Sequence, residues 1–429
     1  MSVKNIVDSI RDPHSAFRNQ WTGGQYSVFR ACFGLYLFVH FARLIPWAAE
    51  MFSNQGALAD GHASPLLRLF PSVFLLNDDP WFVTVVVAGG AALSVMLLLG
   101  WRDRLAAIAL WYIWTCLYGR NPLIGNPGLP YVGLLLVVHA CLPSAPYGSW
   151  ERRHEADPGT AWRLPQSLFV VVWILMAVGY TYSGYTKLVS PSWVDGTAVE
   201  RVLQNPLARP GVIRDLLLAA PPLILQLNTW GALALELLFA PLALFRRVRP
   251  WIWLALLLMH LGLMVLIDFA DLSLGMVMLH LFTFNPGWIR PLREGVTEIL
   301  FYDGNCGLCH RAVRFVLAED TAGQAFRFAP LDSETFRQAV PQTERAALPD
   351  SVVVRTNDGQ LLVRSAAVLY LMQRLGGLWR VLAWLGKLIP MTLRDDLYDG
   401  IAAVRYRLFP KPADVCPIIP RHLRARFDY

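Results

Sequence analysis

The chain has 429 residues, of which 55% are hydrophobic and only 16% are charged, and its mean hydropathy is +0.40. Soluble globular proteins average about 25% charged residues, so this composition excludes a soluble protein over the whole length. The net charge of +7 comes mostly from basic residues beside apolar segments, which suits lipid head groups and predicts no nucleic-acid partner.

The N-terminal 25 residues contain neither an apolar core nor a small-residue cleavage site, so no removable signal peptide is expected. A helix needs about 20 apolar residues, with a range of about 17–25, to cross a bilayer. The candidate spans are Tyr26–Trp47, Pro80–Trp101, Leu105–Tyr118, Leu129–Leu142, Leu164–Thr186, Thr229–Phe245, Pro250–Ile267 and Leu272–Phe284. Two of them are short, but counting both predicts an all-α transmembrane bundle of about eight helices over residues 1–287.

The basic residues predict how this bundle is oriented. With the N-terminus inside, eleven Lys and Arg residues fall on inner segments, including the clusters at 102–104, 152–163 and 246–249, and five fall on outer loops. Inner loops of membrane proteins carry the excess of positive charge. The sequence therefore predicts a multi-pass protein of the cell inner (plasma) membrane with both termini in the cytoplasm.

Three ionisable residues, Lys187, Glu236 and His260, lie in or at the end of apolar segments. Lys187 ends its segment, where a lysine commonly extends to the membrane interface. An unpaired carboxylate at mid-membrane costs about 2.5–3.5 kcal/mol on insertion scales, so Glu236 needs a partner or a water-filled cavity. His260 is either a packed histidine or a member of the same group. Together the three are a candidate membrane site.

The run "NPGWIRPLREG" (285–295) ends the bundle, and residues 288–297 are a predicted linker. The pattern then predicts a strand at Glu298–Tyr302, a helix at Cys306–Glu319 and a strand at Ala325–Ala329. A hairpin turn, "TNDG", separates predicted strands at 350–355 and 360–363, and helical segments follow from 365 to 408. This order predicts an α/β thioredoxin-like domain over residues 298–429.

The thiol pair Cys306 and Cys309 forms a C-x-x-C motif at the start of the predicted helix. Orphan N–H groups and the helix dipole stabilise a thiolate there, so we expect Cys306 to be the more exposed attacking thiol and Cys309 to resolve its mixed disulfides. Asp303 is a candidate proton acceptor. Three other interpretations remain open: a C-x-x-C-H haem attachment site through His310, a zinc site completed by Cys416 and a histidine such as His310 or His422, and inert structural cysteines.

The stretch "YDGNCGLCHRAVRF", with "DSVVVRTNDGQLLVRSAAVLYLM" and "YDGIAAVRYRLF", resembles the DCC family of thiol-disulfide oxidoreductase-like proteins over about residues 298–425. The resemblance implies a thioredoxin-like fold with active thiols at Cys306 and Cys309.

The membrane part resembles a second family. "YSGYTKLVSPSWVDG", "NTWGALALEL" and "LMHLGLMVLIDFADLSLGM" are similar to the HTTM domain that is shared with vitamin-K-dependent γ-carboxylase, over roughly residues 20–287. That resemblance implies a catalytic lysine at Lys187, a functional histidine at His260 and an acidic position at Glu236. It implies chemistry on a quinol or lipid-like substrate.

The leading hypothesis is a membrane-tethered thiol-disulfide oxidoreductase, whose partners are the lipid bilayer and a protein disulfide or thiol. The alternatives are a γ-carboxylase-like membrane enzyme with Lys187 as base, and a non-catalytic membrane scaffold or transporter. A quinone or quinol is the only cofactor suggested, a quinone or a lipid is the suggested substrate of the membrane site, and no metal is expected.

Overall fold

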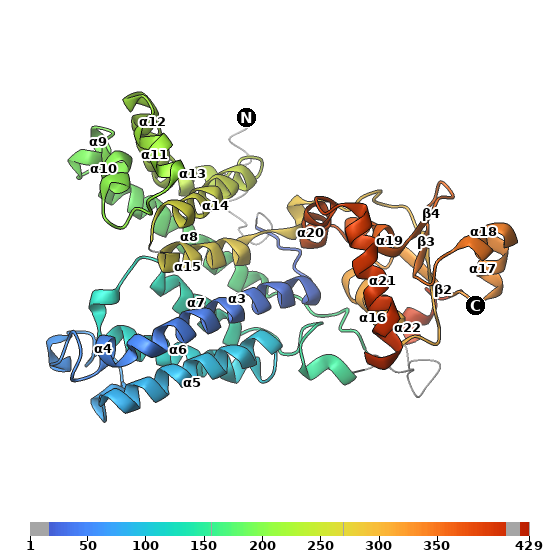
Figure 1. Ribbon diagram of the computed structural model, residues 1–429, viewed down its shortest axis with the longest axis horizontal. Helices are drawn as coiled ribbons and strands as arrows, with labels where there is room; N and C mark the ends of the chain where they lie inside the picture. The colour runs from blue at the N-terminus through green and yellow to red at the C-terminus, as the bar shows by residue number, and fades with distance from the viewer. Residues whose placement is uncertain (1–16, 156, 269, 409–420, 429) are drawn as a thin grey trace. The chain divides into compact units, whose positions relative to one another are not determined.

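The computed structural model describes residues 17–155, 157–268, 270–408 and 421–428 (Figure 1). The chain divides into two compact units, and each is described by itself. The first unit comprises Met1–Arg18, Phe29–Ser144 and Pro165–Phe284, and the second comprises Asn19–Val28, Ala145–Leu164 and Asn285–Tyr429. The predicted second domain contains only residues 298–429. The second compact unit also includes two stretches from earlier in the chain, residues 19–28 and 145–164.

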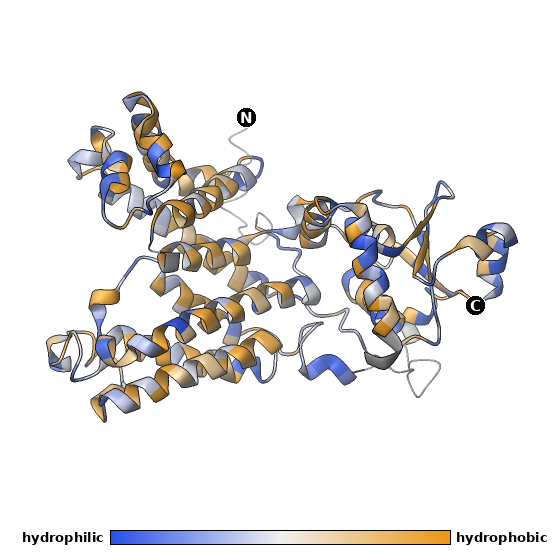
Figure 2. Ribbon diagram, in the orientation of Figure 1, coloured by the Kyte–Doolittle hydropathy of each residue, from blue (hydrophilic) through white to orange (hydrophobic). Residues whose placement is uncertain are grey.

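The first unit is built from α-helices joined by loops and short 3-10 turns, and Figure 2 shows apolar residues along most of these helices. Its helices are α3 (Gly23–Leu44, whose residues 23–28 belong to the second unit), α4 (Ala48–Phe52), α5 (Pro80–Leu99), α6 (Asp103–Arg120), α7 (Leu129–Ala140), α8 (Gln166–Lys187), α9 (Pro191–Val194), α10 (Ala198–Gln204), α11 (Val212–Leu218), α12 (Pro222–Leu237), α13 (Phe239–Ala243), α14 (Arg249–Leu266) and α15 (Ala270–Thr283).

Four stretches among the described residues are long and apolar enough to cross a membrane: Gly23–Phe52, α5, α8 and α14. A fifth is added if α11 and α12, which are bent by 105°, count as one span. The expected eight spans are therefore not confirmed. The predicted span Thr229–Phe245 is divided between α12 and α13. The 12 residues of α7 rise only about 18 Å at about 1.5 Å per residue, short of a hydrocarbon core of about 30 Å.

The second unit contains a small mixed α/β domain. Its sheet has the order β2-β1-β3-β4, in which β1 is parallel to β2 and antiparallel to β3, and β3 and β4 form an antiparallel hairpin. The strands are β1 (Glu298–Tyr302), β2 (Phe326–Pro330), β3 (Val353–Arg355) and β4 (Leu361–Val363). The helices are α16 (Gly307–Glu319), α17 (Glu334–Ala339), α18 (Gln342–Ala347), α19 (Arg364–Leu375), α20 (Gly377–Lys387), α21 (Met391–Leu408) and α22 (Arg421–Arg424).

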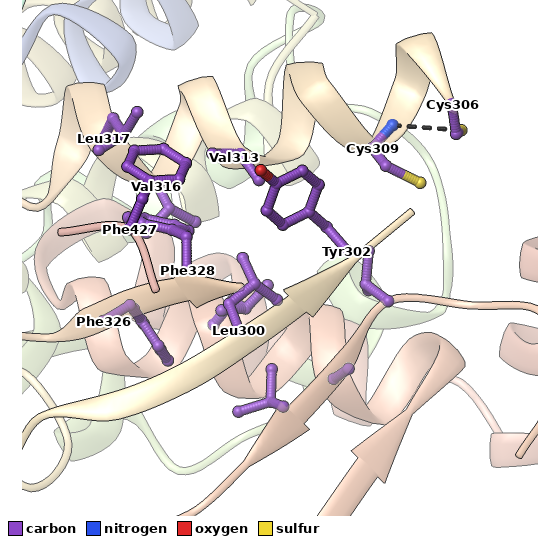
Figure 3. Packing of buried hydrophobic residues seen from close by; sticks show 14 of the residues in the cluster. Leu300, Tyr302, Cys306, Cys309, Val313, Val316, Leu317, Phe326, Phe328 and Phe427 are labelled. Atoms are coloured by element: carbon purple, nitrogen blue, oxygen red, sulfur yellow. Dashed lines mark hydrogen bonds between the residues drawn. The ribbon is translucent and has the colours of Figure 1, made fainter. Parts of the chain in front are cut away.

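Alternating side chains of β1 divide the core of this domain between the two faces of the sheet, as expected for a strand. Leu300 and Tyr302 belong to a cluster with Val313 of α16 and Leu371 of α19. Phe301 points to the other face, where it packs with Phe336 of α17. The thiol helix α16 thus lies on one face of the sheet, directly after its central strand (Figure 3).

The predicted strands, hairpin and helices of the tail are confirmed, with ends shifted by a few residues. The short helices α17 and α18 were not predicted. The two earlier stretches of the second unit contact each other and the tail through aromatic rings: Tyr26 stacks on Trp162 of the other stretch with ring centroids 5.1 Å apart, and Tyr147 lies 6.2 Å from Phe315 of α16 in the tail.

Candidate functional site

The C-x-x-C pair is positioned by the turn between β1 and α16. The Asp303 carboxylate accepts a hydrogen bond from the backbone N–H of Asn305 at 2.8 Å, which closes the turn. Cys306 then has extended backbone angles and is the N-cap of α16. Its Sγ accepts a hydrogen bond from the backbone N–H of Cys309 at 3.4 Å (Figure 3). The sulfur at this place therefore receives a helix N–H that would otherwise be unpaired.

Both cysteines are free thiols, and both are buried. Cys306 has no exposed surface and Cys309 is 5% exposed, so the expectation that Cys306 is the more exposed thiol is wrong. The physical reason is that the two belong to the core cluster that contains Tyr302 and Val313 (Figure 3). A partner disulfide reaches Cys306 only if the turn or its covering side chains move.

His310 follows the pair and is also buried. Its Nε2–H donates to the carbonyl of Gly304 at 2.9 Å, and its ring lies edge-on to Tyr302 with centroids 5.7 Å apart. The imidazole therefore fastens the helix to the turn that carries Cys306. A haem-ligating histidine needs a free ring nitrogen directed at the iron, and this hydrogen bond occupies the outer nitrogen of His310. The sequence motif placed His310 beside the thiols but did not indicate this role.

The opposite end of the thiol helix carries a buried carboxylate, Glu319. It accepts hydrogen bonds from the hydroxyl of Thr22, from the N–H of Gly24 at 2.7 Å and from the indole of Trp379 at 2.6 Å. A Cβ at Gly24 would lie 2.5 Å from Glu319 Oε1, so only glycine permits this approach. Burial raises the pKa of Glu319, and these hydrogen bonds offset part of that rise. The segment 19–28 is thus bound to the helix that carries the thiols.

The first unit contains a separate cavity of about 470 Å³, whose lining includes Lys187, Glu236 and His260. Lys187 Nζ forms an ion pair with the carboxylate of Glu236 and donates to Ser183 Oγ at 3.2 Å. It also lies 4.7 Å from the centre of the Trp193 ring. Lys187 therefore supplies the partner that the buried carboxylate of Glu236 requires.

His260 lines the same cavity but contacts a different group. The hydroxyl of Tyr180 lies 2.7 Å from His260 Nε2 and 3.0 Å from His280 Nε2, so one phenol joins two imidazoles. His280 has no exposed surface. Sequence reasoning missed Tyr180 and His280, because a lone tyrosine or histidine in an apolar helix carries no signal of its own.

Comparison with known proteins identifies the tail. Residues 300–411 match the model of the DCC1-like thiol-disulfide oxidoreductase family. The chain is 33% identical over 134 residues to YuxK, an uncharacterized protein of Bacillus subtilis, and the match covers 93% of YuxK and 30% of this chain. It is 32% identical over 135 residues to a chloroplastic DCC family protein of Arabidopsis thaliana, covering 77% of that protein and 30% of this chain. The chain belongs to the DCC family.

A third match is longer and less similar. YitO, an uncharacterized protein of Bacillus subtilis, is 25% identical over 280 residues, which cover 62% of this chain and 86% of YitO. No solved structure matches the chain. The HTTM resemblance is not shown by these comparisons, so the roles inferred from it remain predictions.

Within the described ranges of the DCC protein, no three His, Cys, Asp or Glu side chains are grouped so as to hold a metal ion. The zinc interpretation named Cys416 and the His422 side chain, and both lie outside the described residues. The proton-acceptor role of Asp303 stays a prediction, because the hydrogen bond described for its carboxylate goes to the turn.

Proposed function

We propose that this DCC protein is a membrane-tethered thiol-disulfide oxidoreductase. The observation that carries the proposal is the position of Cys306, which caps the helix after the central strand and accepts the N–H of Cys309. The sheet order β2-β1-β3-β4 is that of a thioredoxin-like core, which supports the same chemistry. Helices long and apolar enough to cross a membrane support the tether.

The reaction exchanges one disulfide for another. The Cys306 thiolate attacks a disulfide of a partner protein, forming a mixed disulfide and releasing one partner sulfur, which takes up a proton. Cys309 then loses its proton and attacks Cys306 Sγ, which breaks the mixed disulfide and releases the second partner thiol. The partner gains two electrons and two protons, and the Cys306–Cys309 pair becomes a disulfide. The reverse sequence oxidises a partner dithiol.

A redox titration of the full chain in nanodiscs tests this proposal. After equilibration in glutathione buffers, free thiols are alkylated and the protein is digested for mass spectrometry. We expect an intramolecular Cys306–Cys309 disulfide that forms over a single transition. Cys141→Ser, on the other unit, is the matched control and should leave the transition unchanged. Failure to form the disulfide at any potential would leave only the structural interpretation of the pair.

The cavity of the first unit favours a second function. An apolar cavity with one ion pair on its wall suits an amphipathic molecule such as a quinol or a lipid-like compound. We propose that Lys187, after passing its proton to Glu236, accepts a proton from such a substrate, and that His260 and Tyr180 are further polar groups of the lining.

Ligand binding separates this function from a non-catalytic scaffold or transporter. A quinol analogue should bind the full chain, and Glu236→Gln should weaken its binding, because the lysine loses its ionised partner. Glu200→Gln, on α10 outside the cavity lining, should bind as the parent does. If the parent chain binds no quinol or lipid-like compound, the cavity enzyme is excluded and the scaffold remains.

A further inference from the structure

Helix α21 is attached to the α/β domain by its polar side. Its polar contacts with the domain come from Asp395, Tyr398 and Asp399, which follow the spacing of one helix face. Asp395 accepts from the backbone N–H and hydroxyl of Ser365, Tyr398 Oη accepts from the N–H of Val352 at 3.1 Å, and Asp399 pairs with Arg364 at 3.1 Å. A helix on a globular domain normally buries its apolar face. In α21 this relation is reversed.

The apolar side of α21 is exposed. Leu393, Leu397 and Ile401 recur every four residues on the face opposite the aspartates, and each is more than half exposed. The end of α20 and the turn after it extend this surface with Leu385, Leu388 and Met391, of which Leu388 is 80% exposed. These six residues are called the α20–α21 face (Figure 1). Several exposed apolar residues close together in the chain are typical of a binding site.

Charge and aromatic residues indicate what covers this face. Lys387, which is exposed, and the half-buried Arg394 are neighbours of its apolar residues in the chain, as is the exposed Asp396. Trp384 is 46% exposed beside it, with the Arg380 guanidinium 5.3 Å from its ring. An apolar helix face bordered by Lys, Arg and Trp is the composition of helices that lie in the interfacial layer of a membrane. The same chain contains helices able to cross a bilayer, so a lipid surface is available to this face wherever those helices insert.

We infer that the α20–α21 face lies in the interface of a lipid bilayer that contains anionic lipids. Its leucines and isoleucine contact acyl chains, and Lys387 and Arg394 bind anionic head groups. The inference does not depend on thiol chemistry. It has a consequence for that chemistry, since α21 packs against the thiol helix α16: partners of Cys306 would be met at the membrane surface.

Photocrosslinking in the full chain tests this placement. p-Benzoylphenylalanine replaces Leu388 or, in a second variant, Leu397, and the matched control carries it in place of Glu344, an exposed residue of α18. Each variant is placed in nanodiscs of phosphatidylcholine with or without phosphatidylglycerol, irradiated and weighed by intact mass spectrometry. We expect lipid adducts at 388 and 397 and none at 344.

The head-group part of the inference has its own variant. Lys387→Glu should lower the adduct yield at 388 severalfold in phosphatidylglycerol nanodiscs and leave it unchanged in pure phosphatidylcholine. Equal yields at 388, 397 and 344 would overturn the inference. A covalent dimer would instead assign the face to a second copy of the chain, and a crosslink to another segment of the same chain would assign it to an internal contact. Either result overturns the lipid assignment whether or not the Cys306–Cys309 disulfide forms.

Discussion

At the scale of single residues, the two thiols differ in what surrounds each sulfur. Cys306 receives a helix N–H at its sulfur, whereas Cys309 lies one turn inside α16. We therefore predict that Cys309→Ser accumulates mixed disulfides with partner proteins and that Cys306→Ser accumulates none. Non-reducing electrophoresis after rapid acid quenching measures both. Equal trapping by the two variants would contradict the assignment of Cys306 as the attacking thiol.

Glu319 predicts a pH dependence of stability. Burial raises its pKa above 4.5 in the folded protein, so the folded state binds this proton more tightly than the unfolded state. The resulting stabilisation is complete below pH 4.5 and is lost as the pH rises through the folded pKa. Glu319→Gln removes this titration. The melting temperature of the parent should therefore fall relative to Glu319→Gln as the pH rises from 4.5 toward neutrality, as measured by scanning fluorimetry of the full chain. Parallel pH profiles would contradict the prediction.

At the scale of elements, β1 and α19 are joined by a buried ion pair. Glu298 Oε2 accepts from Arg374 Nε at 2.8 Å, and both side chains are at most 1% exposed. Removing one partner leaves a buried charge, so Arg374→Met should lower the free energy of unfolding by about 3–5 kcal/mol. The control, Arg337→Met, breaks the exposed pair with Glu334 and should change it by at most about 1 kcal/mol. Denaturant titration of the full chain measures the free energy of unfolding of both variants. A similar loss in the two would show that Glu298 is stabilised by its other donors.

Sequence patterns predicted the elements that depend on local signals. A short run of consecutive apolar residues placed β1, and the "TNDG" turn placed the β3–β4 hairpin. Helices α17 and α18 have six residues each and too few periods to show a pattern. The burial of Cys306 also could not be predicted, because its core cluster combines nearby residues such as Val313 with residues far away in the chain such as Leu371. For the same reason, the sequence predicted that Glu236 needs a partner but did not indicate how Tyr180 joins His260 and His280.

At the scale of the whole molecule, the number of membrane crossings decides on which side the DCC domain lies. An even number leaves both termini on one side, and the basic clusters favour the cytoplasm. Counting α11 and α12 as a crossing makes the number odd. We predict that the DCC domain lies in the cytoplasm.

A labelling experiment tests this prediction. Because Cys306 is buried, the reporter is a new cysteine, Glu344→Cys, on the exposed helix α18. An impermeant maleimide should label it in inverted vesicles and not in intact cells, measured against the parent chain. Labelling in intact cells would put the domain outside.

The contact between Gly24 and Glu319 joins residues 295 positions apart, and this separation becomes a delay during synthesis. A ribosome adds about 5–20 residues per second, so the segment 19–28 leaves the ribosome about 15–60 s before its carboxylate partner exists. During that interval the N–H of Gly24 and the hydroxyl of Thr22 have to be satisfied by water or by a chaperone. Segment 19–28 is therefore synthesised early but reaches its native contacts late. A chain released before Glu319 is translated cannot complete these contacts.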